Sequence, residues 1–290
     1  MTVTSDVTWT IAAVLKWATD DFRTRGIESP RLDADVLLAH AIGTTRTQLV
    51  IDMQKPLTPL ELGRFRDLVK RRRAREPVAY LVGQREFYGR TFRVDARVLV
   101  PRPDTETLVS VALSRTRGMS MSAHVLDLCT GSGCVAITLA RERPTTEVIG
   151  TDISADAIAL AEENALRLGA YNTTFVTCDL YGDMGTFDLV TANPPYIATG
   201  DVDGLPPDVA RFEPRLALDG GPDGLDIAKR IVTHAHPHLC AGGVLAIEVG
   251  QGLAERAEAM LREAGFTDIE RARDYARIER VVSGVWRGGE

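Results

Sequence analysis

The 290-residue chain lacks any hydrophobic run long enough to cross a membrane. Its longest apolar stretches, residues 36–42 and 125–128, fall far short of the ~18 residues that a membrane helix needs. Residues 1–9 are polar and lack the basic start and apolar centre of a secretory signal. We therefore expect a cytoplasmic protein.

Cysteine is scarce, and no two cysteines form a Cys-x-x-Cys pair. We expect the four to be buried free thiols that behave as small hydrophobic side chains: Cys129, Cys134, Cys178 and Cys240. Histidine patterns are equally uninformative, because His234, His236 and His238 lie two residues apart and would point to different faces of a helix. We expect no metal site.

No large excess of one charge is present, since 34 Lys and Arg oppose 40 Asp and Glu, a net charge of −6. The distribution is uneven. Residues 1–80 carry 13 basic and 10 acidic side chains, net +3, whereas residues 81–290 carry 21 and 30, net −9. The chain has no repeats or low-complexity segment, and its length allows one large and one small domain. We expect the two parts to meet different partners.

The first 80 residues follow a helical period. Apolar positions that include Trp9, Leu15 and Ala18 predict a first helix, and residues 32–42 predict a second that ends at Gly43. A third is predicted from Pro59 to about Arg75, with apolar positions at Leu60, Leu62, Phe65, Leu68 and Val69. It ends in a basic cluster: Lys70, Arg71, Arg72, Arg73 and Arg75. The cluster could bind phosphates or an acidic protein surface, but we favour a simple complement to the helix dipole.

Residues 86–100 alternate like strands, with Gly89 and Arg90 as the predicted turn of a β-hairpin. Asp104 or Thr105 then predicts the cap of a helix. From there, apolar strand and helix patterns alternate, which indicates a mostly parallel sheet covered on both faces. The expected strands are residues 124–128, 147–151, 174–178, 187–191, 244–249, a run around 268 and 278–285, and the expected helices include 135–143, 155–168, 225–239 and 253–264.

Residues 125–136 have the pattern of a strand, a tight glycine turn and a helix start. Gly131 and Gly133 permit unusual backbone dihedrals and close approach of a ligand. Asp152 ends the next strand 19 residues after Gly133, where an acid can accept hydrogen bonds from ribose hydroxyls. We therefore expect a cofactor that contains adenosine.

The glycine pattern also fits NAD, so an NAD-dependent oxidoreductase is one alternative. Asp127, just before the turn, would repel a pyrophosphate at the helix N-terminus. S-adenosylmethionine has no phosphate, and its ammonium and sulfonium groups suit Asp127 and Asp152. Asp179 closes the third strand, where it can accept the adenine amino group. We favour S-adenosylmethionine.

The strand over residues 187–192 ends in Asn193, Pro194, Pro195 and Tyr196. Two consecutive prolines make a stiff turn that can aim Asn193. The side-chain carbonyl of Asn193 and the carbonyl of Pro194 could hold both hydrogens of a planar –NH₂ group, with Tyr196 packed against it. At the carboxyl edge of such a sheet, this turn is the predicted catalytic segment.

Residues 127–133 and 193–196 resemble class I methyltransferases that modify exocyclic or amide nitrogens. Residues 83–89, 101–106 and 219–225 narrow the resemblance to the bacterial release-factor glutamine methyltransferases, the PrmC/HemK family, over nearly the whole chain. The resemblance implies a helical substrate-docking domain (residues 1–80), a β-hairpin linker (81–103) and a Rossmann-like class I domain with a mostly parallel seven-stranded sheet (104–290).

The resemblance also implies N5-methylation of the glutamine in the Gly-Gly-Gln motif of peptide chain release factors, with S-adenosylhomocysteine as the other product. Asn193 to Tyr196 would then hold the glutamine, Asp152 the ribose, and Asp179 and Leu180 the adenine. The methionine part would lie against Cys129, Thr130, Gly131, Ser132 and Gly133. Cys129 stands where the family usually has glycine and Leu180 where an aromatic is frequent, which puts loop tightness and adenine packing in question.

No base of suitable pKa is evident near Asn193, so we expect catalysis to depend chiefly on orientation. The nearest alternative enzyme methylates adenine in DNA or a base in RNA, but the net charge of −9 argues against a long nucleic-acid footprint. A non-catalytic adaptor that docks through the basic helix is a third possibility. We expect a monomer without a nucleic-acid substrate.

Overall fold

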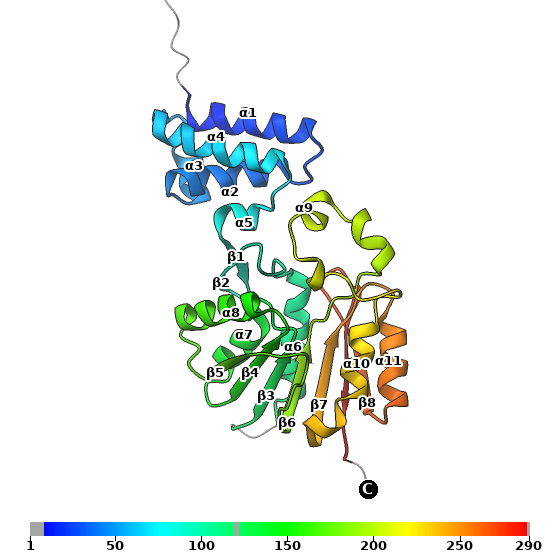
Figure 1. Cartoon of the computed structure of the whole chain (residues 1–290). Coiled ribbons are helices and arrows are strands. Elements are labelled where there is room, and N and C mark those ends of the chain that lie inside the picture. The colour runs from blue at the N-terminus through cyan, green and yellow to red at the C-terminus, as the bar shows by residue number, and fades with distance from the viewer. Residues whose placement is uncertain (1–8, 119–121, 289–290) are drawn as a thin grey trace, which may run out of the picture. The chain divides into compact units, whose positions relative to one another are not determined.

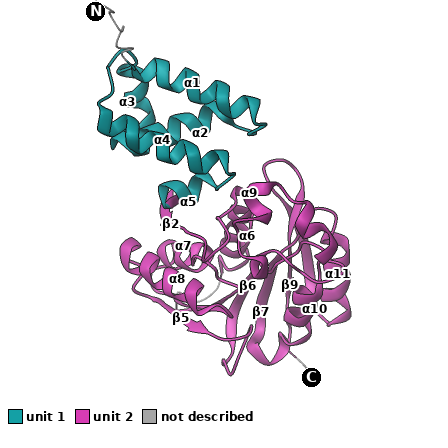
Figure 2. Ribbon diagram, turned by 45° about the horizontal axis from the view of Figure 1, so that its top comes forward, with its two compact units in different colours: residues 1–83 teal, residues 84–290 magenta. Residues whose placement is uncertain are grey.

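The computed structural model describes residues 9–118 and 122–288 (Figure 1). The chain divides into two compact units, Met1–Gly83 and Gln84–Glu290, each with its own core (Figure 2). None of the helices in the described ranges combines the length and apolar character that crossing a bilayer requires. The polar segment 1–8, for which the sequence predicts no export signal, lies outside the described residues.

The described part of unit 1, residues 9–83, contains five helices: α1 (Ile11–Thr24), α2 (Pro30–Ile42), α3 (Arg46–Ile51), α4 (Pro59–Arg73) and α5 (Val78–Val82). The sequence predicts α1, α2 and α4, and Gly43 ends α2 in the left-handed conformation at φ 67°. α3 and α5 are too short to show a helical period. Trp9 and Leu60, both expected on apolar faces, are exposed, and the buried face of α1 is instead formed by Ile11, Val14, Leu15, Ala18 and Phe22.

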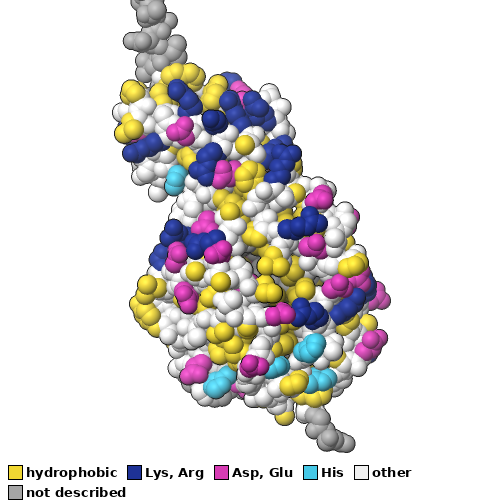
Figure 3. Space-filling view, viewed as in Figure 1, with side chains coloured by type: hydrophobic (Ala, Val, Ile, Leu, Met, Phe, Trp, Pro, Cys, Tyr) yellow, Lys and Arg dark blue, Asp and Glu magenta, His cyan; other side chains and the backbone are white. Residues whose placement is uncertain are grey.

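The basic cluster at the end of α4 is largely neutralised inside unit 1. The Arg72 guanidinium lies 2.7 Å from the Asp33 carboxylate in a buried pair, and Arg73 lies 2.7 Å from Asp21. Arg71 pairs with Glu76. Figure 3 accordingly shows acidic side chains among the Lys and Arg side chains of unit 1. The prediction that these arginines only complement the dipole of α4 is therefore incomplete, because Arg73 and Arg72 also join α4 to α1 and α2.

Unit 2 begins with the antiparallel hairpin of β1 (Gln84–Phe87) and β2 (Arg90–Arg93). Its turn is formed by Tyr88 and Gly89, both at positive φ, one residue earlier than the sequence predicts. A short 3-10 helix, η1 (Pro103–Thr105), then leads into α6 (Glu106–Arg115). Thr105 is the N-cap residue of α6, one of the two residues predicted, but its side chain makes no capping hydrogen bond.

A seven-stranded sheet forms the centre of unit 2, in the order β5-β4-β3-β6-β7-β9-β8. The first five strands of that order are parallel and β9 runs against both of its neighbours. This confirms the predicted mostly parallel, Rossmann-like sheet. The strands are β3 (His124–Leu128), β4 (Glu147–Asp152), β5 (Thr173–Thr177), β6 (Phe187–Ala192), β7 (Leu239–Glu248), β8 (Thr267–Arg273) and β9 (Glu279–Val285).

Helices cover both faces of the sheet because successive strand residues point to opposite sides. Leu126 and Val190 pack with α10 (Asp226–Thr233) and α11 (Ala254–Glu263). Their neighbours Val125 and Leu189 pack with α6, α7 (Cys134–Glu142) and α8 (Ala155–Leu168). The helix predicted over residues 225–239 is too long, since β7 already begins at Leu239.

The four cysteines are free, but only Cys134 is buried. Cys129, Cys178 and Cys240 are partly exposed, so the expectation of buried thiols is wrong for three of the four. Cys129 follows β3 directly, and this placement brings its side chain to the site described next.

Candidate active site

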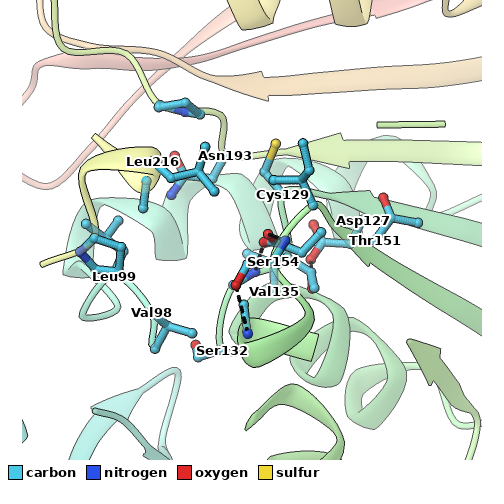
Figure 4. Close-up of a pocket in the computed structure, with 18 of the residues that line it drawn as sticks. Val98, Leu99, Asp127, Cys129, Ser132, Val135, Thr151, Ser154, Asn193 and Leu216 are labelled. Carbon is cyan, nitrogen blue, oxygen red and sulfur yellow. Dashed lines mark hydrogen bonds between the residues drawn. The ribbon is translucent and has the colours of Figure 1, made fainter. Parts of the chain in front are cut away.

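A pocket in unit 2 lies at the carboxyl ends of β3, β4 and β6. It gathers most of the predicted site residues: Asp127, Cys129, Thr130, Gly131, Ser132, Asp152, Asp179, Leu180, Asn193 and Pro195. Gly133, Pro194 and Tyr196 are not among its lining residues. Figure 4 shows Asn193, Leu216 and Leu99 on one side of the pocket and Cys129, Thr151 and Asp127 on the other.

The turn after β3 depends on left-handed backbone at Cys129, Gly131 and Gly133, with φ values of 56°, 55° and 77°. A side chain at Gly133 would have its Cβ 2.9 Å from Ile137 Cδ1, so this glycine permits close packing of α7 and does not face the pocket. Cys129 adopts a conformation that favours glycine. A glycine at this position would adopt the same conformation without strain.

Asp152 holds the glycine turn from the end of the neighbouring strand. Its Oδ2 accepts a hydrogen bond from the backbone N–H of Gly131 at 2.9 Å, and its Oδ1 accepts one from Ser154 N–H at 3.0 Å. Burial raises the pKa of this carboxyl. Each oxygen keeps a lone pair, so the carboxylate can still accept hydrogen bonds from a ligand.

Asp127 is almost fully buried, at 1% exposure. Its two carboxylate oxygens accept hydrogen bonds from the hydroxyls of Thr130 at 2.6 Å and Thr191 at 2.7 Å. Burial raises its pKa to about 6. Asp127 therefore ties the turn after β3 to β6, a contact with Thr191 that the sequence pattern does not reveal.

Asp179 faces the pocket together with an arginine that the sequence analysis missed. Arg230 of α10 places its guanidinium 2.6 Å from the Asp179 carboxylate. Leu180, at φ 52°, turns its carbonyl to accept a hydrogen bond from the Thr151 hydroxyl at 2.9 Å. A lone arginine in an amphipathic helix carries no pattern that would identify it.

Asn193 directly follows β6, and its amide contacts η1. Its Nδ2 donates a hydrogen bond to the hydroxyl oxygen of Thr105 at 3.2 Å. Asp104, the neighbour of Thr105, pairs with Arg280 at 2.9 Å. The two residues expected to cap a helix therefore make contacts at or near the site.

The turn over residues 193–196 is braced by a second loop, residues 218–225. Gly220 N–H donates to the carbonyl of Ile197 at 2.8 Å. A Cβ at Gly220 would lie 2.5 Å from the Pro195 carbonyl oxygen, and one at Gly224 would lie still nearer to the Tyr196 carbonyl oxygen. The loop is thus a wall against which the proline turn is packed.

Tyr196 is not among the residues that line the pocket, although its neighbour Pro195 is. Its ring approaches Gly250, where an added Cβ would lie 3.1 Å from Tyr196 Cδ2. Burial raises the pKa of its hydroxyl to about 12. The packing of its ring against a bound planar group stays a prediction.

Glu248, at the end of β7, was also missed by the sequence analysis. The side chain is buried and interacts with the Thr105 hydroxyl, the same group that contacts Asn193. Burial raises the pKa of Glu248 to about 7. Glu248 is thus linked to Asn193 through Thr105, but it does not line the pocket, and the absence of a catalytic base at Asn193 stays a prediction.

The histidines make structural contacts. His236 stacks on Trp286 at 3.8 Å between ring centroids, and His238 stacks on Tyr181 at 4.5 Å. In the part of the chain that the structure describes, no three His, Cys, Asp or Glu side chains are grouped so that they could hold a metal ion.

Comparison with known proteins gives agreeing matches over both units. Residues 13–83 match the PrmC N-terminal domain, and residues 104–205 match the Methyltransferase small domain. The chain is 45% identical to a release factor glutamine methyltransferase of Geobacter sulfurreducens, over 95% of this chain and 96% of the relative. The corresponding protein of Rhodopirellula baltica is 41% identical, over 96% and 97%.

A solved methyltransferase from Pyrococcus furiosus shares the fold, with a TM-score of 0.50 and 15% identity over 70% of this chain and 91% of that one.

Proposed function

This chain belongs to the release factor glutamine methyltransferase family, and we propose that its pocket binds S-adenosylmethionine and presents the methyl group to a release-factor glutamine. The methyl acceptor is the side-chain amide nitrogen, N5, of the glutamine in the Gly-Gly-Gln motif. The NAD-dependent oxidoreductase and the non-catalytic adaptor do not agree with this family.

The chemistry of the donor set fits a cationic adenosine cofactor. Asp127 and Asp152 lie at the turn after β3 and disfavour a phosphate there, whereas Asp179 is paired with Arg230. Bound S-adenosylmethionine supplies a methyl group activated by a sulfonium. We assign the ribose to Asp152, the adenine edge to Asp179 and Leu180, and the methionine part to the turn over residues 129–133.

Asn193 orients the acceptor. Because its Nδ2 donates to Thr105, its Oδ1 is the atom available to accept a hydrogen bond from the substrate –NH₂ group. The carbonyl of Pro194 is the second acceptor in this proposal. An amide nitrogen is a poor nucleophile, so holding it in line with the methyl group supplies much of the rate, and two carbonyl oxygens stabilise the positive charge that grows on nitrogen.

Apolar side chains line this end of the pocket, and one of them, Leu216, is 59% exposed. Val98, Leu99 and Leu216 are among them. The segments that carry these side chains are joined by the buried carboxylate of Glu213, which accepts a hydrogen bond from Val100 N–H at 3.2 Å and one from Arg102 at 2.5 Å. Exclusion of water strengthens the electrostatic contribution of Asn193.

The observation that carries the proposal is the Asn193 amide, held by Thr105 beside three acidic strand ends in a chain 45% identical to a family member. The test is transfer of label from S-adenosylmethionine to purified release factor, with wild-type release factor and with the motif glutamine replaced. We expect labelling only of the wild-type factor. Labelling of an adenine-containing oligonucleotide instead would favour the nucleic-acid alternative.

Unit 1 is the part that we propose docks the release factor. Its surface carries large exposed apolar side chains, which include Ile51 at 69% exposure, and such surfaces often bind proteins. Ile51→Asp should raise the KM for release factor severalfold without changing kcat. Leu166→Asp, at a position of similar exposure (72%) on α8, is the matched control and should change neither constant.

A further inference from the structure

A buried hydroxyl lies between the Asn193 amide and a buried carboxyl. Thr105 and Glu248 are each 1% exposed. The Thr105 oxygen accepts the hydrogen bond from Asn193 Nδ2, and the Thr105 hydroxyl interacts with Glu248, an interaction that by itself lowers the pKa of that carboxyl. Among the described residues, Oε2 of Glu248 has no hydrogen-bond partner. Burying a carboxyl oxygen without a hydrogen-bond partner costs free energy of folding, so a carboxyl at this place calls for an explanation.

The direction of these hydrogen bonds follows from the groups themselves. An ionised carboxylate can only accept, so the single Thr105 hydrogen is donated to Glu248. The Thr105 oxygen is then left to accept, and the part of Asn193 that can donate to it is the amino group. The side-chain carbonyl of Asn193 is thereby left free to accept a hydrogen bond from a group in the pocket. The reverse orientation would place an amino group against the substrate –NH₂, donor against donor.

We propose that Thr105 and Glu248 are positioning residues for methyl transfer, which fix the Asn193 amide so that its carbonyl faces the acceptor nitrogen. The inference rests on the proposed function, because it takes the acceptor to be an –NH₂ group. Thr105 lines the pocket and Glu248 does not, so Glu248 acts through Thr105 and Asn193 and not on the substrate.

The protonation state of Glu248 should control this orientation. Arg280 of β9 favours the carboxylate, Asp104 of η1 opposes it, and Tyr196 lies close by with a pKa raised to about 12, which keeps its hydroxyl neutral. Burial raises the pKa of Glu248 to about 7. A protonated Glu248 can donate to Thr105 and so reverse the chain of hydrogen bonds, and kcat should therefore fall as the pH drops below about 7.

The first experiment removes the hydroxyl and keeps the shape. Thr105→Val should lower kcat for release-factor methylation about 10- to 100-fold, while the Kd for S-adenosylmethionine changes less than threefold. Thr105→Ser, which restores the hydroxyl, should recover kcat to within about fivefold of wild type. Thr138→Val is the matched control, because Thr138 is a buried threonine whose hydroxyl has no partner among the described residues, and its kcat should equal that of wild type.

The second experiment replaces the ionisable carboxyl of Glu248 by an amide that does not titrate. Glu248→Gln should abolish the fall of kcat below pH 7, because glutamine does not ionise, whereas Thr138→Val should keep it. Thermal unfolding of each variant checks folding, and Thr105→Ala replaces Thr105→Val if the latter does not fold.

Wild-type kcat in folded Thr105→Val, an equal loss in Thr105→Ser, or an unchanged pH profile in Glu248→Gln would overturn the inference. Failure of the wild-type enzyme to methylate release factor would instead overturn the proposed function, so the two failures are distinguishable.

Discussion

The two strand ends that form the pocket are made rigid in opposite ways. The turn after β3 uses left-handed backbone and is held by hydrogen bonds to carboxylates of its own and the neighbouring strand. The turn after β6 uses prolines, and it is held by the packing of residues 218–225, far away in sequence. The first end is thus held mainly by hydrogen bonds to two carboxylates, and the second by close packing together with backbone hydrogen bonds to a distant loop. Damage to each end should therefore change different constants.

The largest effect is expected at the proline turn. Asn193→Ala removes the proposed acceptor for the substrate amide and should lower kcat about 100- to 1000-fold, as loss of one preorganised polar group in an active site typically does. The Kd for S-adenosylmethionine, measured by calorimetry, should stay within threefold of wild type. A variant that loses cofactor affinity as much as turnover would break the division between the two ends.

The bracing loop is the next test. Gly220→Ala would place a Cβ 2.5 Å from the Pro195 carbonyl oxygen, so the turn must shift. We expect kcat to fall at least tenfold with little change in cofactor affinity. Gly200→Ala, where the Cβ would have open space, is the control and should behave as wild type. Wild-type kcat in Gly220→Ala would mean that the loop does not set the position of the turn.

A substitution at the β3 end should change cofactor affinity and leave turnover nearly unaltered. Asp152→Asn replaces one of the two oxygens that accept backbone N–H groups by a donor, which loosens the glycine turn. We expect the Kd for S-adenosylmethionine to rise about tenfold, roughly 1.4 kcal/mol, with kcat at saturating cofactor within threefold of wild type. An unchanged Kd would remove Asp152 from the cofactor site.

The smallest effect is expected at Cys129. Relief of left-handed strain at φ 56° by Cys129→Gly should raise the free energy of unfolding by about 0.5 kcal/mol, since the strain of about 1 kcal/mol is partly offset by the greater freedom of glycine in the unfolded chain. Cys129→Ala keeps the Cβ and should bring no such gain. Denaturant titrations of the two variants make the comparison, and equal stabilities would contradict it.

Most of the sheet and its helices could be predicted because each element has its own apolar pattern in the local sequence. β3 and α8 follow long apolar patterns, and their bounds agree with the expected residues 124–128 and 155–168. The errors have local causes too. α3 and α5 are shorter than two helical turns, and the continuous apolar pattern from α10 into Leu239 hides the start of β7.

The site could be predicted where a polar side chain of suitable chemistry directly follows a predicted strand. Asp127, Asp152 and Asn193 stand at strand ends, and a parallel sheet brings such ends to one edge. Thr105, Arg230 and Glu248 could not be found in this way, because their places depend on the order of strands and on which helix lies beside them. Strand order is a property of the whole sheet and has no local sequence pattern.

The arginines at the end of α4 have a consequence for what unit 1 can bind. A protein gains affinity for a polyanion largely by releasing counterions, and the release counts only cations that are not already neutralised. Three of the five basic residues in the run are already paired with Asp33, Asp21 and Glu76. The run by itself therefore contributes less to a salt-dependent interaction than five unpaired cations would.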